Sequence, residues 1–302
     1  MFPKPALPLV ASKTRNAARL LKTAAMSTAT AKSGFYVTFS DLGSKEECLA
    51  TITMNSPKAN TFDHASLQAL DEAVKQVQTK KGVRGLVLTS AVDGFFSGGF
   101  NLPIFRQIAH HDFLQLWSLG KSVFRRIYSL PVPSVAAIDG HALGLGCVMA
   151  MACQKRYMVE SKKLIGLNEV AVGMPVPEWL SVRFRDLTSP RIAEDLLGVG
   201  AAVVATEACK AGLVDAVFAS KPEMDAAVLG FLQTRAAVSA YAQSETLSAL
   251  RRQFLDYFDQ SYERDNQLFW AAISHPDTQR SIEQALEKLT AKKKGNGQGP
   301  KK

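Results

Sequence analysis

The chain has 302 residues, of which 47% are hydrophobic and 21% charged, a composition typical of a globular enzyme with a sizeable core. The net charge of +9 lies at the ends: the acid-free segments 1–40 and 292–302 carry six and five Lys or Arg residues. Removing these charges leaves −2 for residues 41–291, so we expect no nucleic-acid partner, which would require a basic face on the fold itself. No run of about 18 apolar residues occurs, so we expect no stable membrane insertion.

Residues 1–30 have the composition of a targeting segment. They contain no acid, spaced Lys and Arg residues, and many Ala, Ser and Thr residues. This composition is typical of a mitochondrial presequence, whereas a secretory signal would show a compact apolar core. We therefore predict a mitochondrial matrix protein; the alternative is a basic tail that carries no address.

The next part of the chain alternates strands and helices. Residues 85–90 form a continuous apolar run, typical of a strand buried in a parallel sheet. Helical periodicity marks two segments, 64–80 and 111–128. Further elements are predicted as strands over 37–42, 50–54, 134–138 and 157–159, a helix over 143–153, and a strand or loop over 164–167. Repeated strand, turn and helix predict α/β layering with crossover connections.

The last third of the chain is predominantly helical in pattern. Helices are predicted over 191–197, 206–211 and 226–238, with a strand-like run over 213–218. A long helical region follows over 245–292, with an interruption at residues 274–276, where a proline occurs. The Gly- and Lys-rich segment 293–302 is predicted to be a disordered tail.

The cysteines and histidines suggest no metal site. The four cysteines include no CxxC pair, and the five histidines show no HExxH or related spacing. We therefore expect no metal and reduced, structural cysteines.

Two glycine-rich turns and one glutamate form the most informative pattern. The turns are Phe95 to Leu102 and Asp139 to Cys147, and Glu169 follows an apolar run. Glycine lets the backbone approach a ligand closely, and N–H groups at a turn that opens a helix are free donors at the positive end of its dipole. A carboxylate base in an apolar pocket, together with such donors, suits the removal of a proton beside a thioester carbonyl.

The order of these motifs resembles the crotonase (enoyl-CoA hydratase/isomerase) superfamily. The resemblance rests on Phe96 to Leu102, on Ile138-Asp139-Gly140 before a Gly-Leu-Gly-Cys helix start, and on Gly166-Leu167-Asn168-Glu169. It implies a crotonase-like ββα spiral core over residues 35–200. A C-terminal helical region over 201–292 would then cover the acyl site and form the subunit contacts of a homotrimer.

Within the superfamily, the sequence is most similar to the mitochondrial Δ3,Δ2-enoyl-CoA isomerase subgroup. Residues 165–169 and the stretch Pro177-Glu178-Trp179-Leu180 carry this similarity. The resemblance implies that Glu169 is the catalytic base, and that the backbone N–H groups of Phe100 and Leu145 bind the thioester oxygen. The substrate would be an acyl-CoA thioester, and no cofactor would be required.

The resemblance also implies a path for the substrate. Gly98, Gly99, Asn101 and Leu102 would line the pantetheine and thioester portion. The loop with Lys58 and Ala59 follows an early strand where the superfamily contacts the nucleotide end of CoA. A solvated loop lysine is an equally good interpretation of Lys58. The chain departs from the commoner family pattern with Asn101 in place of Asp and Leu145 in place of Gly.

Three positions separate the alternatives within the superfamily. Hydratases carry a second glutamate where this chain has Val148, and dienoyl-CoA isomerases carry an aspartate where it has Pro177. Glu178, one position further on, is left as a possible second acid. Another crotonase-type enzyme (a hydratase, thioester hydrolase, decarboxylase or dienoyl-CoA isomerase) and a non-catalytic binding member of the family remain the alternatives.

Overall fold

The computed structural model describes residues 34–42, 46–56 and 59–296. The predicted targeting segment over residues 1–30 and the predicted CoA contact Lys58 lie outside these residues.

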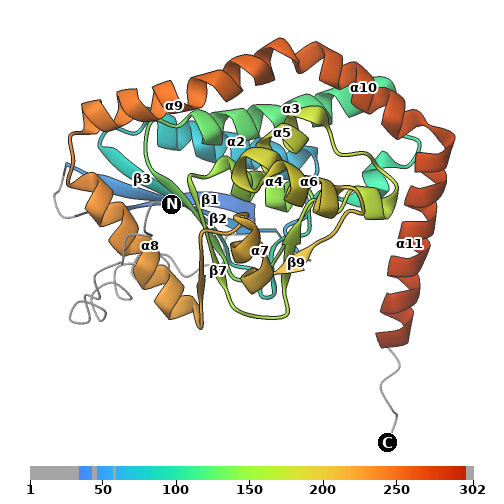
Figure 1. The fold of residues 1–302 in the computed structure, drawn as a ribbon, viewed down its shortest axis with the longest axis horizontal. Helices are drawn as coiled ribbons and strands as arrows, with labels where there is room; N and C mark the ends of the chain where they lie inside the picture. The colour runs from blue at the N-terminus through green and yellow to red at the C-terminus, as the bar shows by residue number, and fades with distance from the viewer. Residues whose placement is uncertain (1–33, 43–45, 57–58, 297–302) are drawn as a thin grey trace, which may run out of the picture.

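Six strands form the main sheet, in the order β1-β2-β3-β5-β7-β10 (Figure 1). β1 and β2 pair antiparallel, and all the other neighbours are parallel. The strands are β1 (Gly34–Asp41), β2 (Cys48–Asn55), β3 (Val83–Ser90), β5 (Ser134–Ile138), β7 (Lys155–Val159) and β10 (Ala216–Phe218). Parallel neighbours need crossover connections, so the predicted α/β layering is confirmed.

A second sheet of four short strands was not predicted. Its order is β4-β6-β8-β9, with β4 (Phe95–Ser97), β6 (His141–Leu143), β8 (Leu164–Gly166) and β9 (Val203–Val204). β4, β6 and β8 are parallel, and β9 pairs antiparallel with β8. Two of these strands lie inside the glycine-rich segments, where the sequence predicted turns only.

The main sheet buries both of its faces. Alternate residues of a strand point to opposite faces, so Leu49, Val87 and Val135 pack beneath helix α8 (Lys221–Ala236). Their neighbours, among them Ile52 and Leu88, face a much larger core. That core lies between the sheet and the helices α2 (His64–Thr79), α3 (His110–Ser129) and α4 (Leu145–Ala152).

Most predicted helices begin and end within two residues of the expected bounds, but α8 begins at Lys221 rather than 226, and the last helical region begins at Ala240 rather than 245. α2 begins with a capping box, in which the Asp63 carboxylate accepts from Ser66 N and Ser66 Oγ accepts from Asp63 N, both at 2.8 Å. All eight residues of α4 are buried, so this helix lies entirely within apolar surroundings.

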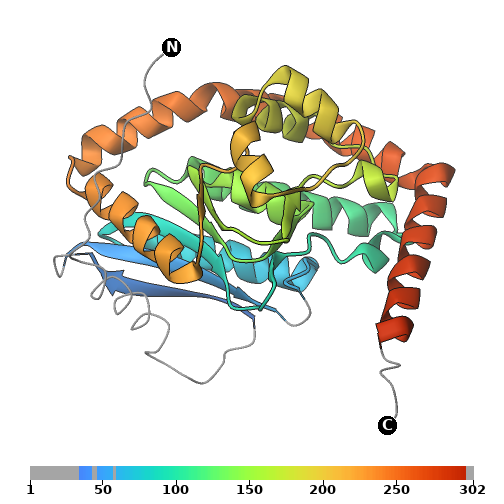
Figure 2. The same ribbon diagram turned by 60° about the horizontal axis from the view of Figure 1, so that its bottom comes forward.

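The C-terminal helices run around the outside of the molecule, from α8 across α9 (Ala240–Gln260) and α10 (Tyr262–Ser274) to α11 (Pro276–Asn296) (Figure 1). They are preceded in the chain by α5 (Glu178–Leu187), α6 (Pro190–Leu197) and α7 (Ala205–Ala211). α9 and α10 run along α3, and α11 descends on the side away from α8 (Figures 1 and 2). No helix in the described ranges is both long and apolar enough to cross a membrane.

Three details of this region differ from the sequence prediction. The break at residues 274–276 is confirmed, but a second break at Ser261 separates α9 from α10 and was not predicted. α5 was not predicted either. α11 continues to Asn296, so the tail predicted to be disordered from residue 293 begins as helix.

A buried ion pair fastens α10 to α3. Lys121 Nζ donates to Asp265 Oδ2 at 3.0 Å, to Tyr262 O at 2.9 Å and to Asn266 Oδ1 at 3.1 Å. Trp117 Nε1 donates to the same Asp265 oxygen at 3.1 Å. The Lys121 and Asp265 side chains are 1% and 6% exposed, and burial lowers the pKa of Lys121 while the Asp265 carboxylate opposes that shift.

Removing one partner of this pair should destabilise the fold strongly. Asp265→Ala leaves the Lys121 charge buried without its counter-ion, and we expect a loss of about 3–5 kcal/mol in the free energy of unfolding. Asp259→Ala is the matched control, because its pair with Arg125 also joins α3 to the C-terminal helices but is 43% and 45% exposed. It should cost less than about 1 kcal/mol. Urea unfolding measures both, and equal losses would contradict the prediction.

Candidate active site

The three segments singled out in the sequence meet at one edge of the small sheet. Each follows one of its parallel strands: Gly98 to Phe100 follow β4, Gly144 and Leu145 follow β6, and Leu167 to Glu169 follow β8. Adjacent parallel strands end at the same edge, where ligands bind in open α/β sheets. The prediction that these segments act together therefore has a topological basis.

Hydrogen bonds fix the backbone conformation of the first glycine-rich turn. Gly98 N donates to Ala59 O at 2.8 Å, and Gly99 N donates to Ser97 Oγ at 3.1 Å. Ala59 is buried and has a φ of 104°, a conformation that is rare outside glycine. The predicted pocket residues Ala59, Gly98 and Gly99 therefore form one hydrogen-bonded unit.

The flanking bonds leave one backbone donor free. Phe62 N donates to Gly99 O and Asn101 N donates to Phe62 O, each at 2.8 Å. In the part of the chain that the structure describes, the intervening Phe100 N–H donates to no acceptor. Phe100 N–H is thus available to a ligand, as the resemblance implies.

A second donor lies at the start of α4. Gly144 N donates to Gly166 O at 3.0 Å, and Gly144, with a φ of 49°, precedes the helix. Leu145 is the first helical residue, and the first N–H groups of a helix have no intrahelical acceptor. Its N–H likewise donates to no acceptor among the described residues.

Glycine is required where these turns touch. A Cβ on Gly99, which has a φ of 84°, would lie 2.7 Å from Leu143 O and 3.2 Å from Leu145 N. A Cβ on Gly144 would lie 3.6 Å from Glu169 Oε1. A side chain at Gly99 would therefore push the two turns apart, whereas at Gly144 the positive φ of 49° is what favours glycine.

The Glu169 carboxyl group is shielded from water. Its Oε2 has no hydrogen-bond partner among the described residues and almost no solvent contact. Burial raises the pKa of Glu169 to about 7, and a backbone hydrogen bond lowers it only in part. A carboxyl group with this pKa can accept and return a proton near neutral pH.

A tight turn fixes the backbone that carries this carboxyl group. Glu169 O accepts from Val172 N and Met174 N, both at 3.0 Å, around the 3-10 helix η2 (Val170–Val172). Gly173 ends this helix with a φ of 81°. The base is therefore set on a short, closed loop rather than on a long flexible segment.

The Phe100 side chain packs in the aromatic core. Its ring lies 5.1 Å from that of Phe105 and 6.3 Å from that of Trp117. Leu102 begins the 3-10 helix η1 (Leu102–Phe105), and Asn101 precedes it without a side-chain cap. Ring packing thus fixes the position of the residue that carries the first donor.

Two titratable residues near these segments, Glu178 and His141, make their contacts elsewhere. Glu178, left as a possible second acid, is at the surface, where its carboxylate pairs with Arg264 on α10 at 2.5 Å and is 51% exposed. His141 Nδ1 accepts from Leu164 N at 3.1 Å and its ring packs against Phe95. Neither arrangement directs a titratable group toward Glu169.

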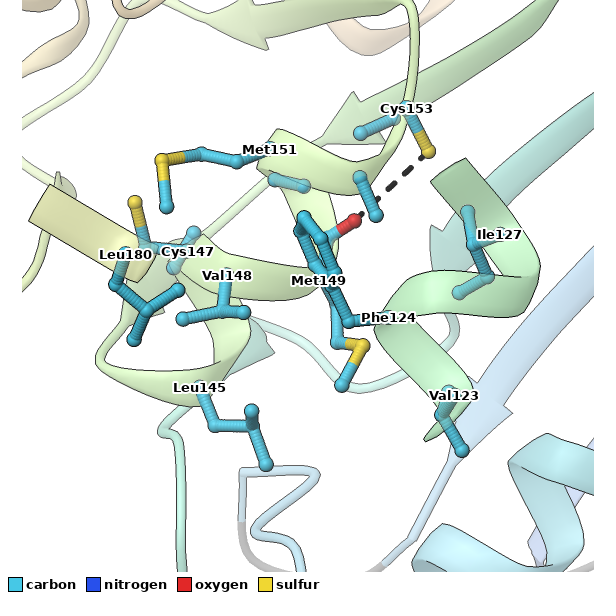
Figure 3. Close-up of a cluster of buried hydrophobic side chains, with 14 of the residues drawn as sticks. Val123, Phe124, Ile127, Leu145, Cys147, Val148, Met149, Met151, Cys153 and Leu180 are labelled. Carbon is cyan, nitrogen blue, oxygen red and sulfur yellow. Dashed lines mark hydrogen bonds between the residues drawn. The ribbon is translucent and has the colours of Figure 1, made fainter. Parts of the chain in front are cut away.

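Val148, at the position where hydratases carry a second glutamate, is an apolar residue in apolar surroundings. Val148 is 1% exposed and lies among the hydrophobic side chains around α4 (Figure 3). Leu145 and Leu180 belong to the same cluster. Val148 therefore contributes no second carboxyl group beside Glu169.

Sequence reasoning missed Asn60. Its side chain is fully buried, accepts from Ser56 N at 2.7 Å, and donates to Ser90 Oγ at 2.8 Å and to Phe96 O at 3.0 Å. It ties the loop after β2 to the first glycine-rich turn. The available signal was weak: asparagine tolerates the left-handed conformation, and Asn60 has a φ of 47°.

No group of three or more His, Cys, Asp and Glu side chains within the described ranges is arranged to hold a metal ion.

Comparison with known proteins identifies the family. The profile of the Enoyl-CoA hydratase/isomerase family matches residues 44–296. Enoyl-CoA delta isomerase 1, mitochondrial, of Rattus norvegicus is 30% identical over 251 residues, which cover 82% of this chain and 86% of the rat protein. A probable enoyl-CoA hydratase of Bacillus subtilis is 31% identical over 256 residues, covering 83% and 96%.

A solved structure agrees with this result. The human mitochondrial delta3-delta2-enoyl-CoA isomerase superposes with a TM-score of 0.80 at 26% identity, covering 85% of this chain and 99% of the human chain. The predicted crotonase-like fold is confirmed. By its fold, its motifs and the extent of these matches, the chain belongs to the enoyl-CoA hydratase/isomerase family.

Proposed function

We propose that the protein isomerises 3-cis- and 3-trans-enoyl-CoA to 2-trans-enoyl-CoA in the β-oxidation of unsaturated fatty acids. One observation carries this proposal: a single shielded carboxyl group, Glu169, lies beside two unpaired backbone donors. The delta isomerases among the relatives and solved structures support it, within a family that acts on enoyl-CoA thioesters.

In the proposed mechanism, the thioester oxygen accepts hydrogen bonds from Phe100 N–H and Leu145 N–H. Glu169 removes a proton from C2, and the C–H bonding pair delocalises into a dienolate whose charge lies largely on that oxygen. The same carboxyl group then delivers the proton to C4, and the double bond moves from C3–C4 to C2–C3. No proton or electron is gained or lost overall, so one base suffices and no cofactor is required.

The two donors have different physical origins. Leu145 N–H is the first of a fully buried helix, so the positive end of the α4 dipole acts in surroundings of low dielectric constant. Phe100 N–H is a turn donor that its neighbours' hydrogen bonds leave free. Loss of one such donor costs on the order of 3 kcal/mol of transition-state stabilisation in other enzymes.

The rest of the substrate would lie along the first glycine-rich turn. We propose that Gly98, Gly99, Asn101 and Leu102 line the pantetheine path, with the loop of Lys58 and Ala59 near the nucleotide end.

We further propose a homotrimer in the mitochondrial matrix. The mitochondrial relatives and the acid-free segment 1–40 support the location, and the exposed apolar side chains of α9 and α10, such as Leu250 and Leu268, are compatible with subunit contacts. Sedimentation equilibrium tests the assembly, and import into isolated mitochondria tests the address.

Replacing the base should abolish turnover without unfolding the protein. Glu169→Gln keeps the size of the side chain but cannot accept a proton, so we expect isomerisation to fall about 10²- to 10⁴-fold. The rise in conjugated thioester absorbance with 3-enoyl-CoA measures the rate, and circular dichroism checks the fold. Substantial isomerisation by a folded variant would contradict the assignment of Glu169.

The activity should depend on pH through Glu169. Because its pKa is raised to about 7, the carboxyl group is protonated and inactive as a base below this pH. We expect kcat/KM to be level above about pH 8 and to fall about tenfold per pH unit below pH 6, since it reports the free enzyme. A profile that stays level down to pH 5 would contradict a desolvated base.

Hydration is the second candidate, because hydratases are among the relatives. It predicts loss of absorbance when 2-trans-enoyl-CoA is supplied. We expect this rate to be at least about 10²-fold below that of isomerisation, because Val148 offers no second acid or base to activate water. A faster hydration rate would favour the hydratase assignment.

A further inference from the structure

One helix near the C-terminus contacts the segments that follow both halves of the site. α11 packs against η1, which follows Phe100, and against η2, which follows Glu169. Figure 2 shows α11 at one end of the molecule, beyond the end of α10. α11 thus braces both the segment that carries the Phe100 N–H (the donor segment) and the segment that carries Glu169 (the base segment).

Gln279 makes hydrogen bonds between α11 and the donor segment, beside an exposed ion pair of Arg106 with Glu283 at 3.6 Å. Its Nε2 donates to Phe105 O at 3.0 Å and to Ile273 O at 2.8 Å, and its Oε1 accepts from Gln107 N at 3.0 Å. Both halves of the side-chain amide are therefore used. Because only an amide offers two donors and an acceptor in this arrangement, no other side chain reproduces the three bonds.

The backbone at Gln107 needs such support. Gln107 has a φ of 51°, in the left-handed region that side chains other than Gly, Asn and Asp rarely adopt. Its N–H is held by the Gln279 side chain 172 residues away in the sequence. Strained residues of this kind persist when surrounding contacts hold them, and they cluster near functional sites.

A second contact reaches the base segment. Gly173, which ends η2, lies against Ser281 so closely that a Cβ on the glycine would be 2.2 Å from Ser281 Cβ. Gly173 and Met174 close the turn that fixes Glu169. Residues two positions apart on α11 therefore touch the two segments whose separation sets the site.

We propose that Gln279 is a positioning residue: through Phe105 and Gln107 it holds the segment that carries the Phe100 donor at a fixed distance from Glu169. The link runs from Gln279 to the Phe105 carbonyl and then through the Phe105 ring, which packs edge-on against the Phe100 ring at 5.1 Å. Gln279 touches no reacting atom. Its role rests on the proposed function, because it supports the donor of that reaction.

The test compares variants at position 279 with a neighbour on the same helix. Gln279→Met keeps the length and removes all three hydrogen bonds, whereas Gln279→Glu keeps only the acceptor for Gln107 N. Arg280→Ala is the matched control, because Arg280 is exposed and, among the described residues, pairs only with Asp277 on its own helix. For each protein, kcat and KM with 3-trans-enoyl-CoA, the melting temperature and amide hydrogen exchange are measured.

Misplacement of a donor affects the transition state more than substrate binding. For Gln279→Met we expect kcat to fall about 10- to 100-fold and KM to change less than about threefold. The kcat of Gln279→Glu should lie between the kcat of Gln279→Met and that of the wild type. Exchange of the amides over residues 100–107 should become faster, while the strands of the main sheet keep their protection and Arg280→Ala behaves like the wild type.

Three results would overturn the proposal: wild-type kcat in Gln279→Met, unchanged exchange over residues 100–107, or accelerated exchange throughout the molecule, which would indicate general destabilisation. If Gln279→Met does not fold, the same criteria apply to Gln279→Glu. If the proposed function itself is wrong, the wild type will show no isomerisation, and this result differs from all three outcomes above. Hydrogen exchange would then still decide whether Gln279 holds the segment.

Discussion

The contact between the two glycine-rich turns is the constraint on which the site depends. Gly99 lies so close to Leu143 O and Leu145 N that no Cβ fits between them. Because of this approach, the free N–H groups of Phe100 and Leu145 belong to one small region, although 45 positions separate them in the sequence. The small sheet makes the approach possible, since β4 and β6 end at the same edge. The short strands are therefore functional scaffolding even though they add little to the core.

The apolar surroundings of α4 affect both charged groups of the proposed reaction, the Glu169 carboxylate and the thioester oxygen of the dienolate. They raise the pKa of Glu169, because its ionised form loses hydration, and they strengthen the helix dipole's field, because no water screens it. Arg183 on α5 caps the other end of this helix by donating to Met151 O from Nε at 3.2 Å and from Nη2 at 3.0 Å. A positive charge there compensates the negative end of the dipole, so the positive end at Leu145 is less opposed.

The sequence was sufficient for features with strong local signals. Continuous apolar runs predicted the buried strands of the main sheet, and helical periodicity predicted α2 and α3. The glycine turns and Glu169 were recognisable because each has an unusual composition. Strands of three residues, such as β4 and β6, are too short to show a periodicity, and no proline or glycine marks the break at Ser261. Long-range side-chain roles were beyond reach: Gln279 and Asn60 act through partners that only the folded chain brings near.

The C-terminal helices connect the stability of the core with the geometry of the site. The ion pair of Lys121 and Asp265 fixes α10 on α3, and the same α3 packs Trp117 against the Phe100 ring. Only His275 separates α10 from α11, so the placement of α10 determines where Gln279 meets η1. A shift of α10 would therefore reach Phe100 by two routes, through the aromatic rings and through α11. In this fold the donor segment depends on residues more than 150 positions further along the chain, which explains why the short motif alone cannot specify the site.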